Sequence, residues 1–353
     1  MKVLLFSRYG TKGASSRVRY LQYIPYLESQ GVSIEISPLF SNHYLECLYA
    51  GKKAWGEVLQ GYLKRLVKLL GVGKYDLLII EKELFPFLPA LAERVLSWLG
   101  IPYLVDYDDA LFHRYDLNRN LVIRKLLSNK IDSVMRHASV VVVGNDYLAD
   151  RARRAGAKNV VTIPTVVDDT RYRVADSKPS GDLVVGWIGT PKTSKYLEPL
   201  IPLFEGLRQD QRIRIVAVGA RAEDFPAGSL EVWEWSEESE IERIQQFDVG
   251  IMPLPDSPWE RGKCGYKLIQ YMACGKPVIA SPVGVNASLV EHGINGYLAD
   301  TDEAWLVCLT AMFKLSSSER ESMGRMGRLK VESDYSLRSQ APRLLELIHT
   351  YAR

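Results

Sequence analysis

The feature that most constrains the fold of this chain is a series of short apolar runs separated by longer amphipathic segments. Buried strands of a parallel sheet have this composition, because helices cover both faces of the sheet. The alternation therefore predicts an α/β fold with two Rossmann-like, doubly wound parallel sheets. The candidate strands are 2–6, 32–36, 76–80, 102–105, 139–143 and 160–163 in the first half, and 183–189, 212–219, 229–235, 247–254, 276–281 and 296–299 in the second.

The length of the chain agrees with two such domains. Single hydrophobic cores rarely grow beyond about 250–300 residues, and this chain has 353. A polar passage at 168–182, DDTRYRVADSKPSGD, has no periodicity and contains Pro and Gly near its end, which indicates an interdomain linker. We therefore expect a first domain over residues 1–168 and a second over 169–338.

The composition is that of a soluble globular protein, with 47% hydrophobic and 25% charged residues. The longest apolar runs are far shorter than the ~20 residues of a membrane span, and the apolar run in MKVLLFSRYG stops too early for a signal peptide. The four cysteines form no CxxC pair, and the histidines lack metal-ligand spacing. We expect a cytoplasmic protein without a structural metal.

Charge divides unevenly between the two halves. Residues 1–168 carry 23 basic and 16 acidic residues, and the remainder carries 22 and 26. A basic first half indicates an anionic partner, namely a membrane surface, a phosphate-bearing substrate or nucleic acid, or else merely a solvated surface. No nucleic-acid recognition motif accompanies the charge, so we expect no nucleic-acid partner.

The segment 51–74 has the pattern of an amphipathic helix. Such a helix lies on an anionic membrane or packs on its own sheet, and the sequence leaves both readings open. Its apolar face would hold Val58, Tyr62, Leu63, Leu66, Leu69 and Leu70, and its basic face Lys64, Arg65 and Lys68.

Both halves open with a strand, a glycine-containing loop and the start of a helix. Backbone N–H groups and the helix dipole at such a junction favour a phosphate or another anion, although the same turn also occurs for purely structural reasons. Neither junction has the GxGxxG or the Walker pattern. The first would form an acceptor or donor-sugar loop from Gly10, Gly13, Ser15, Ser16 and Arg17.

The stretch from Lys263 to Asn286 combines a helix, a strand and a turn. Helical spacing would bury Leu268, Tyr271 and Met272 and place Lys267 and Gln270 on another face. The turn at 282–286 follows the carboxyl end of a strand, where open α/β sheets bind ligands. Lys263, Lys267 and Gln270 would line one side of a ligand crevice, unless the lysines are merely solvated.

The passage ACGKPVIASPVGVNASLVEHGINGYLAD, residues 273–300, resembles the signature of the family 4 glycosyltransferases with the GT-B fold. VVTIPTVVDDTRY at 160–172 is similar to the hinge strand of that family, and WIGTPKTSKYLEPL at 187–200 to the strand and helix that follow the hinge. EVWEWSEESEIERIQQFDVGIMPLP at 231–255 resembles a further family segment. The resemblance covers roughly residues 139 to 300.

The resemblance implies a function and an architecture. The two domains would face a cleft, with a last helix at 339–353 joining the first domain. The family transfers a sugar from a nucleotide-diphosphate donor, with UDP or GDP, and retains its anomeric configuration without a bound metal. KCGYK and IQYM resemble a subset associated with bacterial surface polysaccharides. A glycan or lipid-linked glycan acceptor at the inner face of the cytoplasmic membrane is therefore expected.

The resemblance also implies a donor site, with two departures from the family pattern. The family has an Arg and, five residues later, a Lys, at positions held here by Thr190 and Lys195. Lys263 or Lys267 would replace the missing charge, or Thr190 and backbone amides suffice. The implied donor residues are Gly189, Thr190, Lys195, Trp235, Lys263, Lys267, Gln270, Gly284, Val285 and Asn286.

The second departure concerns a pair of glutamates, E-x7-E, whose positions are occupied by Gly262 and Gln270. A Gln amide still bonds ribose hydroxyls, and Glu260 would substitute for the first glutamate if the loop shifts. These losses favour one rival function, a catalytically inactive GT-B subunit that binds a glycan or a partner. A second rival is a sugar-nucleotide epimerase on the related two-domain fold.

Three carboxylates follow the fourth candidate strand, in LVDYDDALFHRYD at 104–116. Asp106, Asp108 and Asp109 would cluster at the edge of the sheet and raise one another's pKa values. Family members often have His-Asp near this point. One of the three would act on sugar or acceptor hydroxyls, together with Lys195, Lys263 and Lys267 as catalytic residues. Alternatively, Asp108 or Asp109 caps a helix.

Overall fold

The computed structural model describes residues 1–49, 51–174, 181–210 and 213–353. The chain divides into two compact units, of which the first comprises Met1–Thr165, Arg261–Cys264 and Ser339–Arg353, and the second Val166–Glu260 and Gly265–Arg338. Residues 175–180 of the expected linker lie outside the described residues. Tyr172, in the same passage, is buried in the second unit, so part of the expected linker is core.

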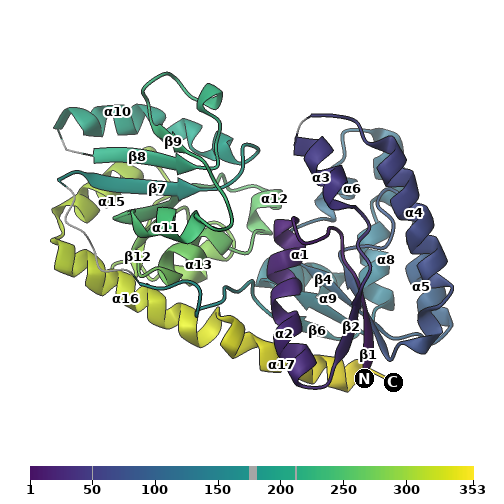
Figure 1. The fold of residues 1–353 in the computed structure, drawn as a ribbon. Helices are drawn as coiled ribbons and strands as arrows, with labels where there is room; N and C mark the ends of the chain where they lie inside the picture. The colour runs from purple at the N-terminus through teal and green to yellow at the C-terminus, as the bar shows by residue number, and fades with distance from the viewer. Residues whose placement is uncertain (50, 175–180, 211–212) are drawn as a thin grey trace. The chain divides into compact units, whose positions relative to one another are not determined.

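The first unit is built on a parallel sheet with the strand order β2-β1-β3-β4-β5-β6 (Figure 1). Each predicted apolar run of this half forms a strand. The order reverses direction between β1 and β3, which defines the switch point of the sheet. The strands are β1 Lys2–Phe6, β2 Ser33–Ile36, β3 Leu77–Glu81, β4 Tyr103–Tyr107, β5 Val140–Val143 and β6 Val160–Thr162.

The second unit repeats this arrangement, with the order β12-β11-β10-β7-β8-β9 and a switch point between β7 and β10. All of its strand pairs are parallel. The predicted fold class of two doubly wound, Rossmann-like sheets is therefore confirmed. The strands are β7 Leu183–Ile188, β8 Ile213–Val218, β9 Glu231–Trp233, β10 Val249–Met252, β11 Val278–Ala280 and β12 Gly296–Leu298.

Helices flank both sheets. In the first half of the chain they are α1 Ala14–Arg19, α2 Ile24–Ser29, α3 Asn42–Tyr49, α4 Trp55–Leu69, α5 Leu91–Trp98, α6 His113–Asp116, α7 Leu121–Leu127, α8 Lys130–His137 and α9 Asp146–Arg154. In the second they are α10 Ile201–Asp210, α11 Glu240–Gln245, α12 Pro258–Arg261, α13 Tyr266–Ala273, α14 Asn286–Leu289, α15 Asp302–Lys314, α16 Ser317–Asp334 and α17 Leu337–Tyr351. Across the described ranges, no helix is long and apolar enough to cross a membrane.

The two ends of the chain meet in the first unit at Asp76. The backbone N–H of Lys2 donates to the Asp76 carboxylate at 2.6 Å, and the N–H of Arg353 donates to the Asp76 carbonyl at 3.0 Å. Figure 1 marks the two termini next to each other. Leu344 and Ile348 of α17 are buried, so the last helix contributes to the core of this unit.

Close backbone packing against α16 positions the end of α13 in the second unit. A Cβ placed on Gly324 of α16 would lie 1.9 Å from the carbonyl oxygen of Gly275, just after α13. Gly275 itself has φ +69°, the left-handed conformation that glycine commonly adopts just after the end of a helix. The contact fixes α16 against the turn that leads from α13 into β11.

Candidate functional site

The loop after β7 is compact because a glycine begins it. A Cβ on Gly189 would lie 2.3 Å from the indole of Trp187. The Thr190 carbonyl accepts the N–H groups of Thr193 and Ser194 at 2.8 and 3.2 Å, which starts the short 3-10 helix Ser194–Tyr196. This turn carries Lys195, whose Nζ lies 5.3 Å from the ring centroid of Tyr196.

A pocket of about 570 Å³ opens beside Lys195, at the carboxyl edge of the second sheet. It is lined by Tyr196 and Glu260, by the loop after β10, and by the residues that follow β11 and β12, namely Ser281, Asp300 and Thr301. Glu260 is buried and accepts a hydrogen bond of 2.5 Å from the Tyr196 hydroxyl. The residue proposed as a substitute glutamate therefore lies in the same pocket as Lys195.

Gln270 belongs to a buried hydrogen-bonded chain and does not share an exposed face with Lys267. Its side-chain amide donates to the Tyr172 hydroxyl at 2.8 Å, which in turn donates to Glu240 at 2.6 Å. The indole N–H of Trp235 donates to the other Glu240 oxygen at 3.0 Å. Gln270 and Trp235, both predicted donor residues, are thus joined through Glu240, which sequence reasoning missed.

Lys267 belongs to the second unit, and its Nζ lies 5.3 Å from the ring centroid of Trp187. The predicted turn after β11 is present, with Gly284 at φ +56° and Val285 partly buried. The Asn286 side chain is buried and donates to the Ser281 carbonyl at 3.1 Å. This amide contact holds the turn against the end of β11.

Lys263 lies in the four-residue segment that groups with the first unit. Asn145 donates to the carbonyls of Gly262 and Lys263, both at 3.1 Å, and the Cys264 thiol donates to the Asp108 carbonyl at 3.1 Å. Lys263 and Lys267 thus belong to different units, and that Lys263, Lys267 and Gln270 line one side of a crevice stays a prediction. α13 begins only at Tyr266, and Lys263 precedes it.

The three predicted carboxylates of the first unit have different environments. Asp106 is fully buried and pairs with Arg19, whose Nε donates at 3.0 Å. Burial raises the pKa of Asp106, against the opposing effect of Arg19. Arg19 therefore covers Asp106, which is not accessible at the edge of the sheet. The first residue of α6 is His113 and its N-cap is Phe112, so neither Asp108 nor Asp109 caps that helix.

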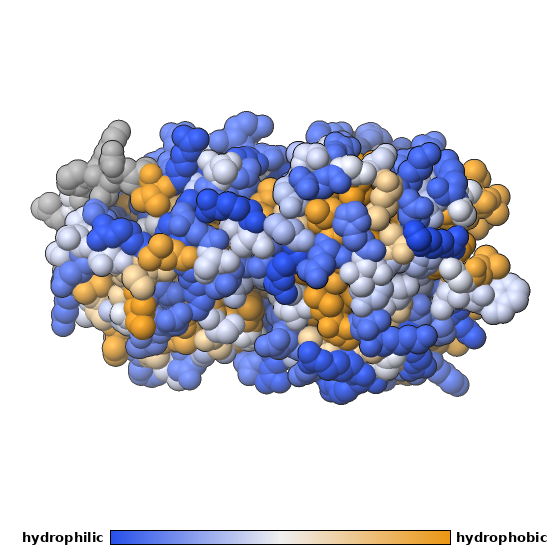
Figure 2. Space-filling model, turned by 90° about the horizontal axis from the view of Figure 1, so that it is seen from below, coloured by the Kyte–Doolittle hydropathy of each residue, from blue (hydrophilic) through white to orange (hydrophobic). Residues whose placement is uncertain are grey.

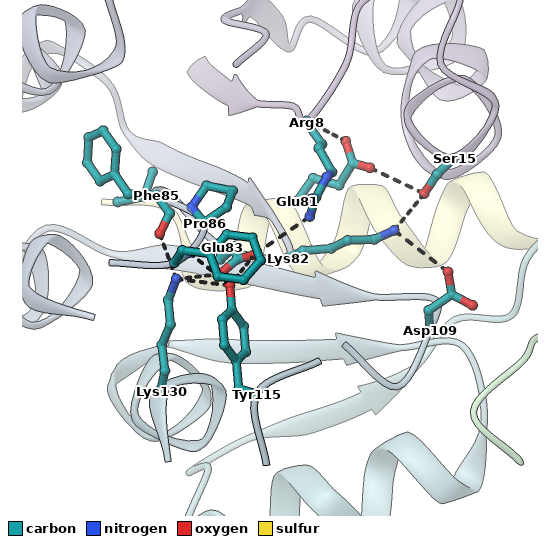
Figure 3. Close-up of polar contacts among 12 residues, drawn as sticks. Arg8, Ser15, Glu81, Lys82, Glu83, Phe85, Pro86, Asp109, Tyr115 and Lys130 are labelled. Atoms are coloured by element: carbon teal, nitrogen blue, oxygen red, sulfur yellow. Dashed lines mark hydrogen bonds and ion pairs between the residues drawn. The ribbon is translucent and has the colours of Figure 1, made fainter. Parts of the chain in front are cut away.

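Asp108 and Asp109 both pair with a lysine that sequence reasoning missed, Lys82. Figure 3 shows its ammonium group next to Ser15 and Asp109. Lys82 Nζ lies 2.9 Å from Asp108 and 3.9 Å from Asp109, and it donates to the Ser15 hydroxyl at 3.1 Å. Ser15 in turn donates to Asp108 at 2.6 Å. Lys82 has φ +70°, a strained conformation that costs about 1–3 kcal/mol and is often found at functional sites.

The electrostatics separate the other two carboxylates, which are both partly buried. Burial alone would raise the pKa of Asp108, but Lys82, Arg19 and the Ser15 hydrogen bond outweigh it and hold the pKa at about 2. Burial and the Asp108 charge raise the pKa of Asp109, while Lys82 and Lys263 oppose that rise. Asp109 is the more accessible of the two, so it is the better placed to exchange a proton.

The predicted glycine loop already binds an anionic side chain of the protein itself, the Glu81 carboxylate. Ser16 donates to Glu81 at 2.6 Å, and the Arg8 N–H donates to the same oxygen at 2.8 Å. The loop packs closely on itself at Gly13, where a Cβ would lie 2.3 Å from the Cβ of Tyr9. A Cβ on Gly10 would lie 2.8 Å from the Asn42 side chain. Arg17, on α1, is partly buried.

A second buried cluster adjoins this loop. Glu83 accepts hydrogen bonds from Tyr115 at 2.7 Å and from Lys130, and Arg8 lies 3.6 Å away. Figure 3 shows these side chains meeting near the end of β3. The sequence does contain a signal for both clusters, because the charged triplet at 81–83 directly follows a buried apolar strand. Among the residues described, no group of side chains is suited to hold a metal ion.

Comparison with known proteins finds a family that the second unit is similar to. Residues 182–313 match the family model described as Glycosyl transferases group 1. The match includes the loop with Lys195, the 570 Å³ pocket, α13 and the turn at Gly284. It thus spans the whole carboxyl edge described for this unit.

Individual relatives are distant. The chain is 23% identical over 255 residues to TuaH of Bacillus subtilis, a glycosyltransferase provisionally assigned to teichuronic acid biosynthesis. That alignment covers 61% of this chain and 64%, less than two thirds, of the relative. Among solved structures, sucrose-phosphate synthase from Thermosynechococcus elongatus superposes with a TM-score of 0.72 at 14% identity, covering 99% of this chain and 98% of that one.

A second solved structure is HepE of Anabaena in complex with UDP-glucose, with a TM-score of 0.67 at 15% identity and coverage of 99% and 100%. A glycosyltransferase from Rickettsia africae gives a TM-score of 0.73 at 14% identity, with coverage of 99% and 98%. At these identities the likeness establishes the fold, which is the GT-B arrangement of two parallel-sheet domains.

Proposed function

We propose that this protein is a retaining family 4 glycosyltransferase that moves a sugar from a nucleotide-diphosphate donor to a glycan or lipid-linked glycan. One observation carries the proposal: the match to the glycosyl transferases group 1 family comprises the residues that form the pocketed edge beside Lys195. The relative assigned to teichuronic acid synthesis supports an acceptor in surface polysaccharide or glycolipid assembly. The reaction would take place in the cytoplasm, at the inner membrane face when the acceptor is lipid-linked.

The donor would bind the second unit. Its diphosphate would lie between the turn at 189–195 and the turn at 284–286, with UDP or GDP as the nucleotide. As the bond to phosphate breaks, negative charge grows on the leaving oxygen, and a fixed ammonium stabilises this transition state more than the ground state. We assign Lys195 and Lys267 of this unit to the stabilisation of the leaving diphosphate. Lys263, from the segment 261–264, would contribute a further cation.

The first unit would supply acceptor chemistry. Lys82 holds Asp108 ionised, while Asp109, with its raised pKa, is accessible. We assign Asp109 to orient or deprotonate a hydroxyl of the acceptor or of the donor sugar. Asp106 is excluded from this role by its burial against Arg19.

Calorimetry with UDP and GDP tests the donor site directly. We expect one of the two nucleotides to bind the wild type, and the failure of both at millimolar concentration would overturn the assignment. We also propose that the reaction needs no metal, because cationic side chains take over the stabilisation of the diphosphate. Activity should then persist in EDTA; loss that manganese or magnesium restores would contradict this.

Turnover of lysine variants tests the chemistry. Lys195→Ala, and at least one of Lys263→Ala and Lys267→Ala, should lower kcat by on the order of 10²–10³. Lys314→Ala, an exposed lysine at the end of α15, is the control and should leave turnover unchanged. Near-wild-type turnover in all three motif variants, with folding intact, would exclude the lysines from catalysis.

Two rival functions give different outcomes in the same assays. An inactive subunit would bind a glycan or a partner but would neither hydrolyse nor transfer the sugar of a nucleotide-sugar donor. An epimerase would convert one nucleotide sugar into another in the absence of any acceptor. Product analysis by mass spectrometry with a panel of nucleotide sugars separates these results.

A further inference from the structure

Helix α4 presents an apolar stripe to solvent. Trp55, Leu59, Leu63, Leu66, Val67 and Leu70 are all more than half exposed, and Trp55 and Leu70 reach 75% and 85%. Their spacing of three or four residues places them on one helix face. The helix packs on its unit through another face, where Gly61 and Arg65 are buried. The stripe is therefore not needed for packing within the unit.

Helix α5 and the loop before it continue this apolar surface. Leu91, Val95, Trp98 and Leu99 are more than half exposed and again recur at helical spacing, with Trp98 at 83%. In the loop, Phe87 and Leu88 are nearly half exposed. Phe87 has φ +58°, a conformation that is costly for an aromatic residue.

Tyr62 connects the two helices. Its ring centroid lies 5.5 Å from that of Phe85, and its hydroxyl donates to the Pro86 carbonyl at 2.6 Å. Phe87 and Leu88 follow directly, so the loop continues from the edge of the α4 stripe into α5. We call the exposed residues of α4, of this loop and of α5 the α4–α5 surface. Figure 2 shows hydrophobic side chains at the right-hand end, where Figure 1 places these helices.

The charges that accompany this surface are mainly positive. Lys52, Lys53, Lys64 and Arg94 are exposed. The acids within 51–74 and 84–100 are Glu57 and Glu93; Glu57 accepts the Ser41 hydroxyl at 2.7 Å, and Glu93 is buried. A pocket of about 230 Å³ beside the stripe is lined by Lys52, Lys53, Trp55, Leu48 and Val58, among others.

We propose that the α4–α5 surface binds an anionic lipid bilayer. Its apolar side chains would enter the boundary between headgroups and acyl chains, and the four cations would pair with lipid phosphates. A large apolar patch alone would equally suit a protein partner. The excess of exposed cations over acids on α4, α5 and the segments before them favours an anionic membrane. This inference goes beyond sugar transfer and does not depend on it.

Vesicle flotation of the full chain tests the proposal. We expect the protein to float with vesicles of phosphatidylcholine mixed with phosphatidylglycerol, to bind pure phosphatidylcholine more weakly, and to be released by salt. Leu63→Glu/Leu66→Glu should weaken partitioning by roughly 10-fold or more. Lys52→Ala/Lys53→Ala should weaken it on the order of 10-fold, on the anionic vesicles only.

The matched control is Met326→Glu/Leu329→Glu on α16, which carries two exposed apolar residues at the same spacing in the second unit. It should float as the wild type does. The exposed Trp55 and Trp98 give an independent readout, since their fluorescence should shift to the blue on the mixed vesicles and should not shift when both are replaced by Phe.

Three results would overturn the proposal: no flotation of the wild type with anionic vesicles, an equal loss in both Glu pairs, or an oligomer that Leu63→Glu/Leu66→Glu dissociates while the wild type ignores lipid. The last would assign the surface to a second copy of the chain. Nucleotide binding, measured by calorimetry on the same variants, should be unchanged. A failure of the lipid proposal is therefore distinguishable from a failure of the donor site.

Discussion

The side-chain amide of Gln270 donates a hydrogen bond to the Tyr172 hydroxyl. This contact explains why a glutamate, which the family pattern has here, is unsuited to position 270. The phenol has a single proton, which it donates to Glu240. A second carboxylate at position 270 would meet the phenol oxygen without a proton between them. The departure therefore follows from the presence of Glu240 and is no sign of a decayed site.

The other departure, Gly262, also has a local cause. A Cβ on Gly262 would lie 2.5 Å from the Cβ of Ala110 and 2.7 Å from its backbone nitrogen. Because backbone atoms cannot move aside cheaply, this position accepts no side chain. A glutamate serving the donor must come from another position, and Glu260 already lies in the pocket beside Lys195.

Gln270→Glu should destabilise the protein by about 1–3 kcal/mol at neutral pH, since it buries a carboxylate without a donor. Burial raises the pKa of the new carboxyl, so the loss should grow as pH rises through that pKa and fade below it. Urea unfolding between pH 5 and pH 8 measures the effect.

The double variant Gln270→Glu/Glu240→Gln is the control for this argument. It restores one carboxylate and one amide around Tyr172 and should recover much of the lost stability. If the double variant is no more stable than the sum of the single losses predicts, the proton-sharing explanation fails.

Lys82→Met should remove a pH-dependent contribution to stability from Asp108. The folded-state pKa of Asp108 is about 2, below its ordinary 3.8, so this contribution is present above about pH 4 and is lost as pH falls towards 2. It amounts to about 2 kcal/mol at neutral pH. The difference between wild type and variant in urea unfolding should shrink from pH 7 to pH 3; a constant difference would contradict the assignment.

At the scale of single elements, two helix glycines should respond in opposite ways to the same change. Gly324→Ala would place a Cβ 1.9 Å from a backbone oxygen, whereas Gly206 in α10 has no atom within 4 Å of that position. We expect Gly324→Ala to cost about 1–3 kcal/mol and Gly206→Ala to add about 0.5–1 kcal/mol.

Thermal and urea unfolding of the two variants measure this contrast, and each serves as the control for the other. A stabilised Gly324→Ala variant would show that α16 does not pack against the turn at Gly275 as closely as described.

Sequence reasoning located the strands well because a strand covered on both faces is apolar along its whole length. The buried face of a helix was harder to assign. Arg65, predicted on the basic face of α4, is buried and donates to the Leu84 carbonyl at 3.1 Å and the Ser37 carbonyl at 2.9 Å. These carbonyls belong to other segments, so the spacing within α4 contains no signal for them.

At the scale of the whole molecule, the two units should respond separately to ligand. Ile348→Ala removes a fully buried side chain of α17 and should cost the first unit about 2–5 kcal/mol. UDP or GDP, bound by the second unit, should stabilise that unit alone. Scanning calorimetry should show one transition lowered by Ile348→Ala and another raised by nucleotide.

Gly324→Ala serves here as the complementary variant, since it should lower the nucleotide-sensitive transition. A single transition that all three perturbations shift together would show that the units unfold as one.

The site was predictable only where it follows a continuous motif. The second unit's loop, pocket edge and turn lie within a stretch that resembles a known family, so Lys195 and Gly284 could be predicted as candidate residues. The first unit's cluster assembles Ser15 from α1, and Lys82 and Asp108 from the ends of β3 and β4. The charged triplet at 81–83 is a sequence signal for only one of these three places. Long-range pairing of this kind is set by topology, which the sequence shows only indirectly.

Because residues 2 and 353 both contact Asp76, a circularly permuted gene could encode the two units almost one after the other. The first unit is assembled from three stretches, so no single cut separates it from the second. With the ends joined by a short linker and the chain reopened after Thr165, the stretches Ser339–Arg353 and Met1–Thr165 would become one continuous reading frame. Such a circular permutant would encode the second unit first and nearly the whole of the first unit after it, with only Arg261–Cys264 left behind as an insertion.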